Sequence, residues 1–125
     1  MPVLDYSQFI GIDYEPPHGC FKLVDHVFKH GYEVDLGKLD DGLENADSHK
    51  RTARIQKKLS ELAVEVDDPK EGDVVIFKGR PWHIGLVIEP GQMLHSYRGG
   101  TSCIESYNSI RWQSRIEGFY RYKLC

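Results

Sequence analysis

The spacing of hydrophobic positions changes near residue 70. Before it, apolar residues recur at three- and four-residue intervals over residues 20–30 and again over residues 53–63, which predicts two amphipathic helices. After it, short β-branched and apolar runs are separated by glycine and proline, which predicts strands. The predicted strands cover residues 74–77, 82–88, 92–97, 102–107 and 116–122. Helices followed by strands indicate an α+β fold.

The residues that flank the predicted helices define where they begin and end. Residues 15–19 contain two prolines and a glycine and cannot be helical, so Cys20 lies at or near the N-terminus of the first helix. The second helix is expected to begin at a capping residue, Asp47 or Ser48, and to end before Asp67. A short helix or turn over residues 6–10 and a loop over residues 35–46 complete the first half.

Short turns join the predicted strands, and such an arrangement is typical of an antiparallel meander. Five strands follow from the pattern, and residues 64–66 add a sixth if they pair with the sheet. We therefore expect N-terminal helices packed on an antiparallel sheet of five or six strands.

Composition predicts a single globular domain over residues 1–125. Hydrophobic residues make up 40% of the chain and aromatic residues 11%, which is enough for a packed core. The net charge of -3, with basic residues interspersed among acidic ones, gives no reason to expect nucleic acid as a partner.

Targeting signals and the number of cysteines bear on the expected cellular location and on the state of the thiols. No apolar run approaches the roughly 20 residues that a membrane span needs, and the first residues lack the basic start and apolar stretch of a signal peptide. We expect synthesis in a cytoplasm, or export without a cleaved signal. Three cysteines cannot all pair with one another, so at least one thiol is expected to be free.

Two histidines stand in consecutive predicted strands, at positions that usually bury apolar side chains. His83 is the second residue of the run 82–88 and His95 lies in the run 92–97, with Pro90 and Gly91 in the turn between them. A histidine in an apolar strand is more often a hydrogen-bonded core residue than a functional one. Two such histidines on neighbouring strands suggest a site.

Whether the two histidines share a face depends on the register of the hairpin. If His83 directly faces His95, the residue numbers of opposed pairs sum to 178 and the loop is wide. A tight turn of Pro90 and Gly91 gives a sum of 181, opposes His83 to Arg98 and places His95 on the other face. A site that uses both histidines therefore predicts the wider loop around residues 87–91.

Together with Cys20, the histidines form a candidate catalytic triad. A thiol at a helix N-terminus has its thiolate stabilised by backbone N–H groups and the helix dipole. A cysteine hydrolase also needs a base and a polar group that orients the base. Cys20, His83 and His95 can take these roles in that order. The oxyanion donor can be the Cys20 N–H or the Tyr14 hydroxyl.

Other groupings of the same residue types remain open. His26 and His30 are four residues apart on the first helix and could bind a metal, although no third ligand is evident. A zinc site could combine the candidate residues Cys20, His83, His95 and Cys103, but the CxxC spacing is absent. Cys103 follows both histidines in the chain and lies in a strand, without the helix start that would activate it.

The sequence resembles the NlpC/P60 family of papain-like cysteine peptidases over most of its length. Residues 9–14, ending in Tyr14, resemble the entry segment, and Gly19 to Val24 resembles the box that holds the nucleophile. Residues 71–77 are similar to its Gly-Asp strand, residues 83–88 to its His-Val-Gly-Ile strand, and residues 92–95 to the strand with the third polar residue. Residues 116–121 and the compact length resemble phage tail-associated members.

This resemblance implies a papain-like fold and hydrolysis of peptide bonds in peptidoglycan stem peptides. It implies Cys20 as nucleophile, His83 as base, His95 as the orienting residue and Tyr14 as an oxyanion donor. No cofactor or metal is implied. The expected substrate is the stem peptide, other phage tail proteins are expected partners, and the expected location is the virion tail, or the host cytoplasm during assembly.

The box around the cysteine departs from the family pattern. Gly19 stands where the family usually has aspartate, and Lys22 stands at the position of its glycine. The alternative function is therefore a structural subunit of the tail tip or of tail assembly that keeps the fold with little or no catalysis.

Overall fold

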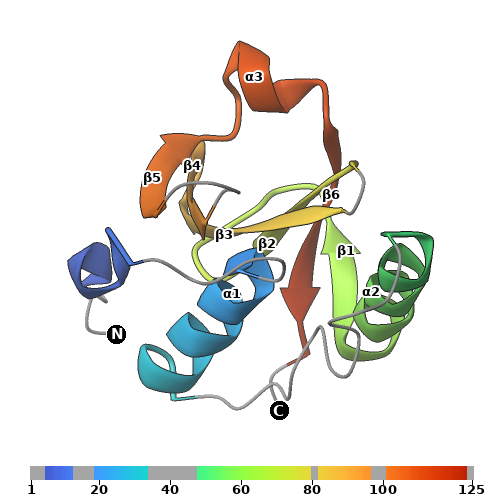
Figure 1. Cartoon of the computed structure of the whole chain (residues 1–125), viewed down its shortest axis with the longest axis horizontal. Helices are drawn as coiled ribbons and strands as arrows, with labels where there is room; N and C mark the ends of the chain where they lie inside the picture. The colour runs from blue at the N-terminus through green and yellow to red at the C-terminus, as the bar shows by residue number, and fades with distance from the viewer. Residues whose placement is uncertain (1–4, 13–18, 34–47, 80–81, 97–100, 124–125) are drawn as a thin grey trace.

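The computed structural model describes residues 5–12, 19–33, 48–79, 82–96 and 101–123. Its helices flank a single sheet (Figure 1). The helices are η1 (Tyr6–Phe9), α1 (Gly19–His30), α2 (Ser48–Leu62) and α3 (Ile110–Gln113). The strands are β1 (Ala63–Val66), β2 (Val74–Phe77), β3 (His83–Glu89), β4 (Gln92–Ser96), β5 (Ser102–Ser106) and β6 (Ile116–Tyr122). The predicted α+β class is confirmed.

The six strands form one antiparallel sheet in the order β1-β6-β2-β3-β4-β5. The optional sixth strand is therefore present, and Ala63, expected at the end of the second helix, belongs to it. Strands β2 to β5 form the predicted meander, but β6 lies between β1 and β2. The meander prediction was wrong for this last strand, because short turns specify only the pairing of consecutive strands.

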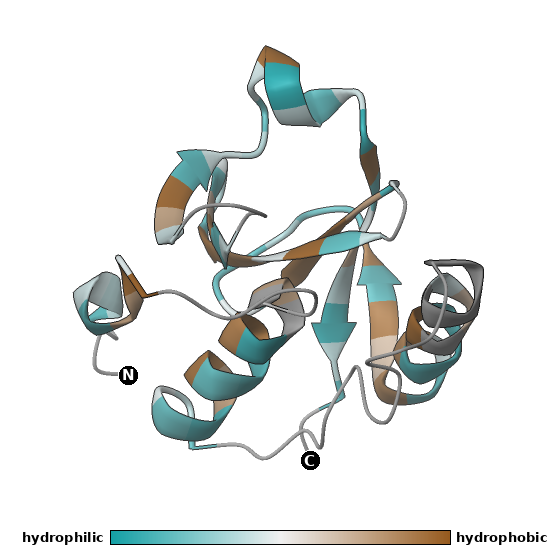
Figure 2. Cartoon of the chain, in the orientation of Figure 1, coloured by the Kyte–Doolittle hydropathy of each residue, from teal (hydrophilic) through white to brown (hydrophobic). Residues whose placement is uncertain are grey.

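The larger part of the core lies between the helices and one face of the sheet. Helix α1 packs on β3 and β4, and α2 packs on β1. Figure 2 shows the apolar and polar segments that alternate along α1, as an amphipathic helix requires. The buried side chains of this first core include Leu23, Val24, Val27, Phe28, Ile55, Leu59, Ile84, Leu86 and Leu94. Among the described helices, none is long and apolar enough to cross a membrane.

A second, smaller core covers the opposite face of the sheet, and we call it the Trp112 cluster. Its members are Val75, Phe77, Val87, Met93, Tyr107 and Trp112. Trp112 comes from α3, a single-turn helix between β5 and β6 that the hydrophobic pattern did not predict. Such a short helix has too few residues to show a helical period, so hydrophobic spacing cannot reveal it. The fold therefore buries both faces of its central strands.

The start of β2 is held to β6 by an ion pair. The carboxylate of Asp73 is buried and accepts hydrogen bonds from Arg121 Nε and Nη2, each at 2.9 Å, and from the Lys70 N–H at 2.7 Å. Gly72, just before it, has a φ of 93°, in the left-handed region that glycine adopts most readily. The Gly72-Asp73 pair thus sets the path by which the chain enters the sheet.

Gly85 in the middle of β3 allows the two histidine strands to pack closely, and its replacement is expected to destabilise the fold. A Cβ at this position would lie 2.8 Å from Met93 Sδ and 3.2 Å from Val75 Cγ1. We predict that Gly85→Ala lowers the free energy of unfolding by about 1–3 kcal/mol, as overpacked cores do. Urea denaturation measures this change. The control is Glu89→Ala at the exposed end of the same strand, and equal stabilities of the two variants would contradict the prediction.

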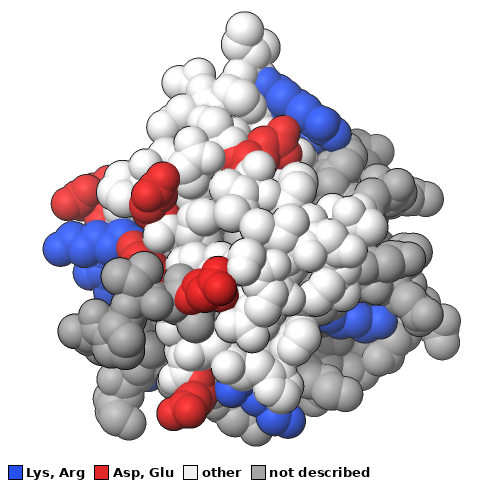
Figure 3. All heavy atoms as spheres, turned by 90° about the vertical axis from the view of Figure 1, so that its left-hand side faces the viewer, with Lys and Arg blue, Asp and Glu red and all other residues white. Residues whose placement is uncertain are grey.

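The face seen on the left of Figure 1 is largely uncharged. Figure 3 shows acidic side chains scattered around a broad neutral area, with a few lysines and arginines towards its edges. This view contains no continuous basic surface among the described residues.

Candidate active site

His83 and His95 lie side by side on the face of the sheet that carries the Trp112 cluster. The distance between His83 Nε2 and His95 Nδ1 is 2.9 Å, a hydrogen bond between two buried side chains that are 8% and 0% exposed. Each ring is thus desolvated except towards its polar partners. Buried imidazoles need such partners, so the pair is a built arrangement of two polar groups.

The hairpin reaches this geometry by a register that the sequence analysis did not consider. The turn is tight, with Glu89 opposite Gln92, but the register then shifts, so that Val87 lies opposite Met93. One extra residue in β3 forms a β-bulge at this point, and a bulge restores the shared face that a tight turn alone would remove. The prediction that a shared face needs a wide loop with directly opposed histidines was therefore wrong. The histidines are diagonal neighbours.

Aromatic side chains enclose the histidine pair. The Trp112 indole stacks on His83 at a centroid distance of 5.3 Å and an interplanar angle of 21°, and it meets His95 edge-on at 5.2 Å. Phe77, opposite His83 in the β2–β3 pair, contacts both His83 and Trp112. These rings leave each imidazole little freedom to rotate and keep water from its faces.

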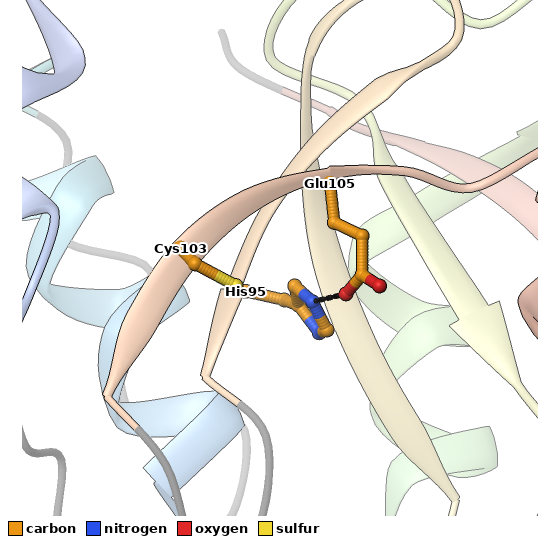
Figure 4. Close-up of side chains that lie close together, drawn as sticks. All are labelled: His95, Cys103 and Glu105. Atoms are coloured by element: carbon orange, nitrogen blue, oxygen red, sulfur yellow. Dashed lines mark hydrogen bonds and ion pairs between the residues drawn. The ribbon is translucent and has the colours of Figure 1, made fainter.

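Glu105 on β5 is a site residue that the sequence analysis missed. Its Oε1 lies 2.7 Å from His95 Nε2, and Figure 4 shows the two side chains pointing towards each other. The sequence contains one indication of its position: Cys103, Glu105 and Tyr107 are alternate residues of a predicted strand and therefore share one face of the sheet. An isolated acidic residue in a strand gives no indication of its partner, however, and the pairing with β4 supplies it.

Burial governs the protonation of both histidines. Burial, together with the neighbouring His95, Arg115 and Arg111, lowers the pKa of His83 from 6.5 to about 3. Burial also lowers the pKa of His95, although the hydrogen bond that it donates to Glu105 acts in the opposite direction. Burial opposes ionisation of Glu105, but the hydrogen bond from His95, together with the nearby Trp112 and Arg111, outweighs it and lowers the pKa of the carboxyl. At neutral pH the site therefore holds two neutral imidazoles and a carboxylate.

Stability is expected to fall on acidification because of His83. Its pKa is lower in the folded chain, about 3, than the 6.5 of an unperturbed histidine, so the unfolded chain binds more protons between these values. The loss begins below pH 6.5 and amounts to up to about 1.4 kcal/mol per pH unit for one such group. Urea denaturation from pH 7 to pH 5 measures it. In His83→Gln this contribution is absent, and an unchanged slope in that variant would refute the assignment.

Cys20 occupies the position that the sequence predicts for it, the second residue of α1. The side chain is half-buried, forms no disulfide, and packs against the first core. The first turn of a helix favours the thiolate over the thiol. Tyr14, the candidate oxyanion donor, lies outside the described residues.

Cys103 lies directly opposite His95 in the β4–β5 pair. Its sulfur, a nitrogen of His95 and a carboxylate oxygen of Glu105 all lie within 4.8 Å of one another, the only such group of potential metal ligands in the described parts of the chain. This group differs from the zinc set considered from the sequence, and it does not include the helix pair His26 and His30.

The geometry at His95 is nevertheless that of a hydrogen bond. Two ligands of one tetrahedral zinc ion, each about 2.0–2.2 Å from the metal, lie about 3.3 Å apart. The 2.7 Å between His95 Nε2 and Glu105 Oε1 is too short for a metal between them. The structure thus favours proton sharing over metal binding at this point.

Comparison with known proteins places this arrangement in a family. The family model described as "NlpC/P60 family" matches residues 19–121, from the residue before Cys20 to the end of the sheet. The chain belongs to the NlpC/P60 family. NlpC/P60 proteins are in general cysteine peptidases that act on the cell wall, and the cysteine, the histidine hairpin and the α+β fold described above agree with that membership.

A solved NlpC/P60 structure shows the same fold. It is a protein from Staphylococcus aureus described as similar to a lipoprotein of the NLP/P60 family, with a TM-score of 0.59 and 14% sequence identity. The similarity covers 94% of this chain and 39% of the other, so this chain spans well under half of that protein's length. A search of the curated proteins found no significant match.

Proposed function

We propose that this NlpC/P60 domain is a cysteine endopeptidase that cleaves peptide bonds in peptidoglycan stem peptides. The observation that carries the proposal is the buried hydrogen bond between His83 and His95, in a chain whose family match begins beside Cys20. A peptidase of this kind needs a thiol, a base and a group that holds the base. Cys20 is the nucleophile, His83 the base and His95 the orienting residue.

The reaction follows from these roles. His83 takes the proton of the Cys20 thiol, and the thiolate attacks the carbonyl carbon of the scissile amide. His83 then gives this proton to the leaving amine as the carbon–nitrogen bond breaks, which leaves a thioester on Cys20. Water, deprotonated by His83, hydrolyses the thioester and releases the new carboxylate. The Tyr14 hydroxyl and the Cys20 N–H stabilise the oxyanion in both halves.

The low pKa of His83 is consistent with a base that is neutral before the reaction. Its ring receives a proton only when the thiolate forms, and the two opposite charges then stabilise each other in a site with little water. Burial by Phe77 and Trp112 strengthens this attraction.

We further propose that the domain acts in a phage tail, where it opens the wall locally, with other tail proteins as partners. The support is the resemblance of residues 116–121, which lie in β6, to tail-associated members. The competing proposal is a structural tail subunit with the same fold. It is favoured by Gly19 and Lys22, which replace the usual residues beside the nucleophile.

Digestion of purified sacculi tests the proposal. The protein is incubated with sacculi and with soluble stem peptides, and the products are identified by mass spectrometry. An endopeptidase releases fragments with new free amino groups and leaves the glycan strands intact. Wild-type protein that leaves both substrates unchanged would support the structural role.

A further inference from the structure

The two hydrogen bonds of His95 form a continuous chain of polar groups. Glu105 Oε1 lies 2.7 Å from His95 Nε2, and His95 Nδ1 lies 2.9 Å from His83 Nε2. Both ring nitrogens of His95 are thus engaged, one by each neighbour. In a neutral imidazole one nitrogen donates and the other accepts, so the partner at one nitrogen determines the role of the other.

Of these three hydrogen-bonded side chains, Glu105 is the only one whose own chemistry determines whether it donates or accepts. An ionised carboxylate accepts hydrogen bonds and donates none. Its side chain is 30% exposed, so water solvates the charge, and the hydrogen bond from His95 favours the ionised form and lowers the pKa. His95, 0% exposed, has no such contact with solvent and stays neutral, since burial lowers its pKa.

We propose that Glu105 is a positioning residue that sets the tautomers of both histidines and thereby makes His83 Nδ1 the basic atom of the site. The carboxylate requires a proton on His95 Nε2, which leaves Nδ1 as an acceptor. That acceptor requires a proton on His83 Nε2, so His83 Nδ1 is the nitrogen that carries the lone pair and can take a proton. The role of His83 Nδ1 in catalysis rests on the proposed function, whereas the assignment of the two tautomers does not depend on it.

Without Glu105, nothing determines which of the two histidines donates the hydrogen bond between them. A His95 ring with no acceptor at Nε2 can carry its proton on either nitrogen, and His83 can then equally present Nδ1 or Nε2 as its donor. When the proton of His83 lies on Nδ1, that nitrogen cannot accept the proton of a thiol. Among the described groups beside the pair, Arg111 and Trp112 on α3 are not anionic acceptors, and burial raises the pKa of the Cys103 thiol on β5, which stays protonated at neutral pH.

Nitrogen-15 NMR of protein labelled at histidine reads the tautomers directly, because protonated and unprotonated ring nitrogens resonate at well separated shifts. In the wild type we expect protonated Nε2 and unprotonated Nδ1 in both His83 and His95. In Glu105→Leu we expect mixed tautomers at both rings. Glu105→Gln, whose amide can donate or accept, is expected to give an intermediate result and serves if the leucine variant does not fold.

Cys103→Ala is the matched control, since it removes the other side chain beside His95 and leaves the carboxylate in place. It is expected to retain the wild-type tautomers. Protonated Nδ1 on either histidine of the wild type, a cationic His95, or wild-type tautomers in the two Glu105 variants would overturn the proposal.

Kinetics on stem peptides then separate this inference from the proposed function. If the protein is a peptidase, Glu105→Leu is expected to lower kcat about 10- to 100-fold with little change in KM, the range typical of a lost orienting partner. Wild-type protein that shows the expected tautomers and cleaves nothing would refute the peptidase and leave the role of Glu105 intact. Unchanged kcat in an active enzyme would refute the positioning role.

Discussion

Replacing Cys20 with alanine is expected to abolish cleavage of stem peptides, with a loss of about 1,000-fold or more in kcat. No other group in the proposed mechanism can form the thioester, and removal of a nucleophile costs a covalent enzyme almost its whole chemical advantage. The measurement is the release of free amino groups from a synthetic stem peptide. Stability should change little, because the side chain is small and only half-buried.

Cys103→Ala is the matched control for this result. It removes a second free thiol, one that lies opposite His95, and it is expected to retain activity within about twofold. The pair of variants distinguishes Cys20, which chain order favours, from Cys103, which follows both histidines. Loss of activity in Cys103→Ala with retention in Cys20→Ala would assign the nucleophile to β5 and overturn the proposed roles.

Trp112→Ala is expected to have the largest effect on the fold. The indole is fully buried, is the centre of the smaller core, and stacks on His83 while it contacts Phe77 and His95. Truncation of such a side chain leaves a cavity and typically lowers the free energy of unfolding by about 3–5 kcal/mol. Thermal and urea denaturation measure the loss. Water admitted to the cavity should also raise the pKa of His83 towards 6.5, since burial is what lowers it.

A neighbouring position on the same helix supplies the control. Ile110 begins α3 and is 96% exposed, so Ile110→Ala is expected to change stability by less than about 0.5 kcal/mol. Trp112→Phe keeps part of the ring contact and should cost less than alanine. If Trp112→Ala is as stable as Ile110→Ala, the smaller core does not hold the histidine strands in place.

The local order of the elements could be predicted from the sequence. The spacing of apolar residues and the two prolines before Cys20 placed that residue at a helix start, and strands β2 to β6 were found within about two residues. Two parts of the fold were not predictable in this way. α3 is too short to have a period, and the entry of β6 between β1 and β2 depends on pairing between strands that are distant in sequence.

The candidate site likewise has features that the sequence predicts and features that depend on tertiary contacts. The sequence by itself determined which residue types are available: a thiol at a helix start and two histidines in neighbouring strands, all in segments that resemble family motifs. Only the tertiary structure decided how they combine, since a single bulge between Val87 and Glu89 determines whether His83 and His95 share a face. The acceptor of His95 was likewise decided by strand pairing, because Glu105 reaches His95 only through the alignment of β4 with β5. Hydrophobic periodicity is a local property, whereas register and hydrogen-bond partners are set by contacts between distant segments.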